Sequence, residues 1–86
     1  MSITRETVAR KLAAYLHHEI SLGDLVDWAQ LAMMEGEFDD AYHDVIRDAI
    51  VRLGLADVRA FGLTWENFET ILKRLGYDAR IKIIAV

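Results

Sequence analysis

The stretch Ile20-Ser21-Leu22-Gly23-Asp24-Leu25 contains a complete start signal for an α-helix. The hydroxyl of Ser21 can accept a hydrogen bond from an unpaired amide of the first turn, and Asp24 stands where its side chain can bond back to the cap. The apolar residues at both ends of the stretch form the contact that fixes the angle at which the chain enters the helix. Residues 3–8 and 63–68 repeat the pattern with threonine as the cap. The sequence therefore predicts three capped helices.

Two glycines provide matching stop signals. The stretches Arg52-Leu53-Gly54-Leu55 and Arg74-Leu75-Gly76-Tyr77 each place a glycine after the last apolar residue of a helical pattern. Glycine adopts the left-handed backbone conformation that commonly ends a helix. Together with apolar side chains at helical spacing, these signals predict a mainly α fold, a compact four-helix bundle. The expected helices cover residues 5–17, 22–35, 40–53 and 65–75.

The last residues of the chain have a different pattern. Ile81 and Ile83 alternate with Arg80 and Lys82 before the sequence becomes fully apolar, which predicts a short C-terminal β-strand over residues 79–85. A single strand leaves its backbone amides and carbonyls unpaired. We therefore expect it to pair with residues 1–4, with residues 58–61 or with a second chain.

Length and composition restrict the class of protein. The chain has 86 residues, which corresponds to a single domain over residues 1–86. It has no cysteine, so it offers no disulfide or thiolate chemistry, and this composition suits a reducing compartment. It also has no proline. Neither a signal peptide nor an apolar run of about 20 residues is apparent, so we expect a cytoplasmic protein that does not enter a membrane.

Charge is unevenly distributed along the chain. Residues 24–48 contain eight acids and one base, a net charge of −7, whereas residues 70–86 contain four bases and one acid, a net charge of +3. Such blocks are either two solvated faces of a small domain, or an acidic surface that docks a basic protein, or complementary surfaces that join two copies head to tail. The residues that we expect to contact a partner are Asp24, Asp27, Glu35, Glu37, Asp39, Asp40 and Asp44.

The sequence lacks the motifs of common metal and cofactor sites. An EF-hand loop that begins at Glu35 needs glycine at position 6 and glutamate at position 12, but those positions hold Asp40 and Ile46. The adjacent His17 and His18 would point about 100° apart on a helix. His43 has only Asp39 or Asp40 at a workable spacing, whereas zinc sites need three or four ligands. We expect no metal and no cofactor.

Catalytic and nucleic-acid motifs are equally weak. Ser2 and Ser21 occupy a terminus and a cap, and the chain has no Gly-rich phosphate loop, so we expect no enzyme activity. A helix-turn-helix would place residues 22–35 in the major groove, but this segment has no lysine or arginine to meet phosphate. An antitoxin-like regulator that contacts nucleic acid through its basic ends is the third functional hypothesis. Those ends contain Arg5, Arg10, Lys11, Lys73 and Arg74.

The helix predicted over residues 22–35 is apolar around more than half of its circumference, more than a small bundle can cover. We therefore expect a homodimer in which the C-terminal strand pairs between chains and shelters part of this helix, with a monomeric intrachain hairpin as the alternative. The residues expected at the contact are Trp28, Leu31, Ile81, Ile83 and Ile84. A homo-oligomeric structural or regulatory subunit is the second functional hypothesis.

Residues 8–34 resemble the beginning of small bacterial immunity proteins of the colicin D type. The matching positions are Leu12, Leu16, Ile20, Ser21 and Leu25, within an amphipathic helix, an Ile-Ser helix start and a second helix. The resemblance implies a small acidic helical protein that inhibits a basic nuclease by covering its active site. Residues 71–77 are also similar to the end of some helix-turn-helix antitoxins. The leading hypothesis is thus a protein–protein interaction module whose acidic middle docks a basic partner, which the resemblance implies to be a toxin.

Overall fold

The computed structural model describes residues 1–58 and 62–80. Within them the chain forms four α-helices, two short strands and one 3₁₀ helix. The mainly helical fold predicted from the caps and apolar patterns is confirmed. In chain order the elements are β1 (Ser2–Ile3), α1 (Arg5–Leu16), α2 (Leu22–Glu35), β2 (Glu37–Phe38), the 3₁₀ helix η1 (Asp40–Tyr42), α3 (His43–Gly54) and α4 (Trp65–Arg74).

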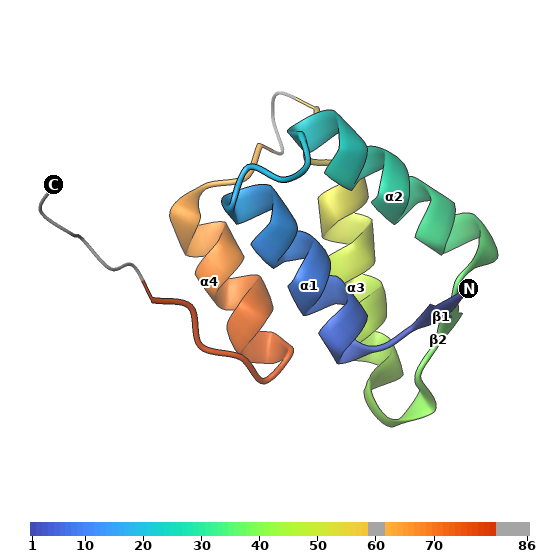
Figure 1. Cartoon of the computed structure of the whole chain (residues 1–86). Helices are drawn as coiled ribbons and strands as arrows, with labels where there is room; N and C mark the ends of the chain where they lie inside the picture. Colours follow the sequence, from blue (N-terminus) through green and yellow to red (C-terminus); the bar gives the residue numbers. More distant parts are fainter. Residues whose placement is uncertain (59–61, 81–86) are drawn as a thin grey trace, which may run out of the picture.

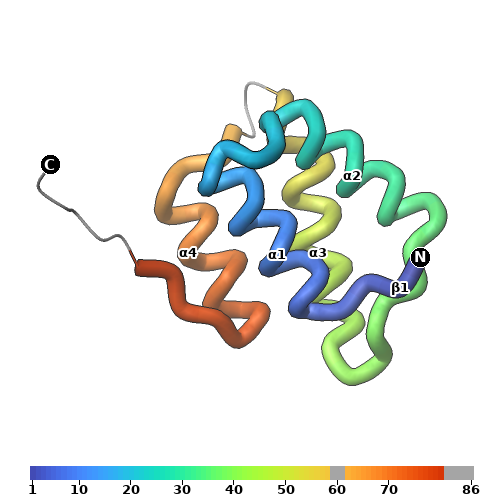
Figure 2. Tube along the Cα trace, in the orientation of Figure 1, coloured from blue at the N-terminus to red at the C-terminus, as the bar shows by residue number. Residues whose placement is uncertain are grey.

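The helices pack around one core. Figure 1 shows α1 in front of α3, with α2 and α4 on either side. The pair α2 and α3 makes the most extensive contact between helices. Figure 2 follows the chain from the end of α2 through a loop that passes beside the amino terminus before α3 begins.

All three predicted helix starts are present as capping boxes. The amide of Asp24 donates to the hydroxyl of Ser21 at 3.1 Å, and the amide of Ser21 donates to the carboxylate of Asp24 at 3.1 Å. Thr4 forms the same reciprocal pair with Thr7 at the start of α1, and Thr64 with Asn67 at the start of α4. Each box satisfies amides that the first helical turn leaves unpaired.

The β-structure differs from the prediction. Strand β1 pairs in parallel with β2: the amide of Glu37 donates to the carbonyl of Met1 at 2.7 Å, and the amide of Asp39 donates to that of Ile3 at 3.0 Å. The amino-terminal residues, expected as one possible partner of a C-terminal strand, thus pair with the segment after α2. In the strand predicted over residues 79–85, Ala79 and Arg80 have no strand structure, and the remainder lies outside the described residues.

The two predicted helix stops have different outcomes. Gly76 adopts the left-handed conformation with φ of 92°, and the amide of Tyr77 donates to the carbonyl of Leu72 at 2.8 Å, as expected for a glycine stop. The prediction for Gly54 is wrong, because α3 includes this residue. A methyl group on Gly54 would lie 2.8 Å from the terminal carbon of the flexible Met33 side chain, so this part of α3 lies against α2.

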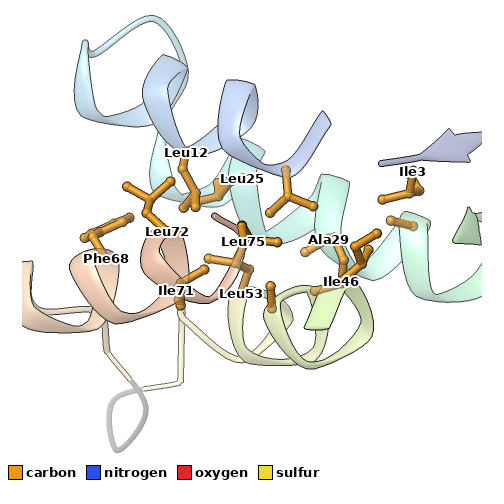
Figure 3. Packing of buried hydrophobic residues seen from close by; sticks show 14 residues of the cluster. Ile3, Leu12, Leu25, Ala29, Ile46, Leu53, Phe68, Ile71, Leu72 and Leu75 are labelled. Carbon is orange, nitrogen blue, oxygen red and sulfur yellow. The ribbon is translucent and has the colours of Figure 1, made fainter. Parts of the chain in front are cut away.

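The core lies between the four helices, and strand β1 closes one end of it. Figure 3 shows side chains from α1, α2, α3 and α4 pointing toward one another, with Ile3 of β1 at one side. No buried side chain in the described residues is polar or charged. The larger members that are fully enclosed are Ile3, Leu12, Leu25, Ile46, Ile50, Leu53, Leu75, Val8 and Val26.

Candidate protein-binding surface

The seven acids expected to contact a partner all have exposed side chains. We call them the acidic region. The elements that contain them, α2, β2, η1 and the beginning of α3, follow one another along one edge of the molecule (Figure 1). Asp24 and Glu35 lie in the first and last turns of α2, about 16 Å apart along the helix axis. Glu37, Asp39, Asp40 and Asp44 follow beyond the end of that helix.

Two residues of the acidic region also hold local structure. The pKa of Asp24 is lowered, chiefly because its carboxylate accepts the backbone amide of Ser21, with smaller contributions from the Ser21 hydroxyl and from Lys11. The carboxylate of Asp39 accepts the amide of Ala41 at 3.4 Å and caps η1. These two acids therefore also have a structural role, which the capping pattern predicts for Asp24.

Most of the remaining acidic side chains have no partner within the protein. Among residues 1–58 and 62–80, the carboxylates of Asp27, Glu35, Glu37 and Asp40 make neither an ion pair nor a hydrogen bond. Asp44 lies 3.7 Å from a guanidinium nitrogen of Arg47 and 3.6 Å from an imidazole nitrogen of His43, a weak exposed arrangement. The acidic region thus keeps most of its negative charge.

Two large apolar side chains lie among these acids on α2. Residues 24, 27, 31, 34 and 35 recur at intervals of three and four, which places them within about 100° of the helix circumference. We call this set the outer face of α2. Within it Leu31 is 44% exposed and Met34 is 81% exposed. Sequence reasoning identified Leu31 but missed Met34, although its spacing of three from Leu31 was an available signal.

The other residues expected at a self-association contact lie elsewhere. Trp28 is half-buried against the core, and the ammonium nitrogen of Lys11 lies 5.6 Å from the centre of its ring. This placement makes Trp28 more a packing residue than a free contact. Ile81, Ile83 and Ile84 lie outside the described residues.

Several residues of the basic ends are engaged within the protein. Arg5 donates to the carbonyl of Leu75 at 3.3 Å, and its guanidinium carbon lies 3.7 Å from the centre of the Tyr42 ring. Arg74 donates to Asp48 at 3.1 Å. Arg10 pairs with Glu6 on the exposed side of α1 at 2.6 Å. These contacts reduce the positive charge available to a phosphate backbone.

Two grooves flank α4. The groove between α1 and α4 has a volume of about 450 Å³ and is lined largely by apolar residues, including Leu16, Trp65 and Leu72. The groove between α3 and α4, of about 340 Å³, contains Asp48 and Arg74, which already bond to each other. In the described part of the chain, no group of three or more His, Asp or Glu side chains is arranged to hold a metal ion.

Comparison of the chain with protein-family models, with curated proteins and with solved structures found no match. None of the described helices combines the length and apolar character needed to cross a membrane.

Proposed function

We propose that this protein is an interaction module that binds a basic protein partner through the acidic region. The observation that carries the proposal is the set of four exposed carboxylates that lack ion pairs within the described residues: Asp27, Glu35, Glu37 and Asp40. Uncompensated charges of one sign on one edge attract a partner of opposite charge and increase its rate of association. The resemblance of residues 8–34 to colicin D-type immunity proteins suggests a basic toxin as the kind of partner.

The test is capture of a partner on the tagged protein, followed by titration with that partner in purified form. Replacement of Asp39, Asp40 and Asp44 by asparagine should weaken binding about tenfold, since exposed charge pairs contribute up to about 1 kcal/mol each. The affinity of the unmodified protein should fall as salt concentration rises.

A matched variant removes the same number of charges elsewhere. Glu19, Glu66 and Glu69 lie outside the acidic region, and their replacement by glutamine should change the affinity less than about twofold. If the two triple variants bind the partner with equal affinity, the proposed role of the acidic region is excluded.

A further inference from the structure

We propose that the outer face of α2 binds an amphipathic helix that has basic flanks, with Leu31 and Met34 as the apolar anchors. This inference rests on the proposed function and narrows it to one surface and one kind of partner segment. The face is unusual because an 81% exposed methionine and a 44% exposed leucine lie on the side of α2 away from its buried residues, Leu25, Val26, Ala29 and Ala32. Large exposed apolar side chains that lie next to each other mark binding surfaces.

The charges around these anchors select the partner. Asp24, Asp27 and Glu35 share the outer face, and the face contains no lysine or arginine. A partner that buries Leu31 and Met34 must bring its own flanking residues close to these carboxylates. Lysine or arginine at those flanking positions would form favourable pairs, whereas acidic residues would be repelled.

The same face of a second copy does not satisfy this requirement. In a two-fold contact through the outer face of α2, the same patch meets itself, so carboxylates of one copy would lie near those of the other. Lys11, which contacts Trp28 of α2, belongs to α1 and does not share the outer face. A heterologous basic partner therefore fits the charge better than a two-fold contact of this face with itself.

The backbone of α2 favours a helical partner. Its amides and carbonyls bond within the helix, so the outer face offers no edge to which a strand could add. A partner must therefore bind α2 through the row of side chains on its outer face. A helix with apolar residues at every third or fourth position presents a matching row to Leu31 and Met34.

The experiment uses a fluorescent synthetic peptide that is helical, with leucine at every third or fourth position and lysine on both flanks, and a peptide with glutamate in place of lysine. The protein should bind the lysine peptide in anisotropy titrations, and not the glutamate peptide. The double variant Leu31→Ala and Met34→Ala should weaken binding at least about tenfold. The double variant Asp27→Asn and Glu35→Gln should reduce the salt dependence of binding.

A matched control removes exposed apolar surface elsewhere. Tyr77 is 39% exposed and lines the groove between α1 and α4, and Tyr77→Ala should leave binding within about twofold. Because Leu31 and Met34 are exposed, their truncation should leave the helical circular dichroism signal unchanged.

Three results would overturn this inference. They are unchanged binding by the Leu31 and Met34 variant, equal binding of the glutamate peptide, or a homodimer that dissociates when these two residues are truncated. If the Asp39, Asp40 and Asp44 variant loses the purified partner while the Leu31 and Met34 variant keeps it, the proposed function stands and only the α2 site is wrong. If neither variant affects a bound partner, both proposals fail.

Discussion

His18 ends helix α1 in the left-handed backbone conformation, with φ of 61°. Its amide donates to the carbonyl of Tyr15 at 3.0 Å, and the amide of Glu19 donates to that of Ala14 at 2.8 Å. This bond pattern usually has glycine in the position that His18 occupies. For a residue with a side chain, this backbone conformation is unfavourable in free energy, and the packing of the surrounding chain must offset that strain.

Replacement of His18 by glycine should therefore stabilise the protein. We expect a gain of about 0.5–1 kcal/mol in the free energy of unfolding, because relief of the backbone strain exceeds the greater entropy of glycine in the unfolded chain. Urea denaturation measures this change. Gly76→Ala is the control and should lose at least about 1 kcal/mol, since Gly76 has φ of 92°. A lower stability of His18→Gly would contradict this interpretation.

Arg5 joins three separate parts of the chain. It is the first residue of α1. Its guanidinium group stacks on the Tyr42 ring and donates a hydrogen bond to the carbonyl of Leu75 at the end of α4. A positive charge at the C-terminus of a helix also interacts favourably with the helix dipole. Sequence reasoning placed Arg5 among the free basic residues because no local pattern predicts contacts across 37 and 70 positions of sequence.

Arg5→Ala should reduce the free energy of unfolding by about 1–2 kcal/mol, as it removes the ring contact and the charged hydrogen bond. Arg10→Ala removes only an exposed pair with Glu6 and should cost about 0.5 kcal/mol or less. Thermal or urea unfolding of both variants gives the comparison. Equal losses would show that the contacts of Arg5 contribute nothing specific.

Among the helices, α4 is held differently from the others. Phe68, Ile71, Leu72 and Leu75 fix it to the core through large side chains, and a groove runs along each side of it. By contrast α2 and α3 make the most extensive contact between helices. Fewer close backbone approaches give a helix a lower local stability.

Hydrogen exchange tests this difference between elements. Backbone amides in the middle of α4 should exchange faster than those in the middle of α2 and α3 under native conditions, because local opening of α4 requires less disruption of the core. Nuclear magnetic resonance resolves the amides individually. Equal protection of all three helices would mean that the bundle opens only as one unit.

The ion pair between Asp48 and Arg74 connects α3 to α4 and predicts a pH dependence. Hydrogen bonds from Arg74, and then from Arg47, lower the pKa of Asp48 below its ordinary value of 3.8. Its stabilising effect is therefore complete above that value and is lost as the pH falls through the lower pKa of the folded protein. Asp48→Asn should be less stable than the unmodified protein at pH 6, and the difference should shrink at about pH 3. A difference that is independent of pH would exclude the ion pair as its source.

At the scale of the whole molecule, local signals predicted the helices and missed the contacts between distant segments. The caps at Thr4, Ser21 and Thr64 were readable because each depends on residues only three positions apart. The pairing of β1 with β2 depends on residues 35 positions apart and has no local pattern. The inclusion of Gly54 in α3 was not predicted either, because its local pattern resembles that of Gly76, which does end a helix.

The candidate surface was predictable in part. Sequence charge identified the acidic region, and the exposure of its seven side chains agrees with a surface location. The capping pattern predicts the bond between Asp24 and Ser21, and helical spacing places Leu31 and Met34 on one face with acids. That this face is exposed was not predictable, because it depends on which side of α2 packs against the core. The fold thus divides α2 into a core side and an acidic outer face.

The most direct measurement is a map of amide chemical shifts when isotope-labelled protein is titrated with the basic leucine–lysine peptide. We predict that the largest shifts will occur along the outer face of α2, around Asp27, Leu31 and Met34, and will weaken at high salt. Amides of α4 should change little. Shifts concentrated in the groove between α1 and α4, or an absence of salt-dependent shifts on α2, would contradict the proposal that this acidic face binds a basic partner.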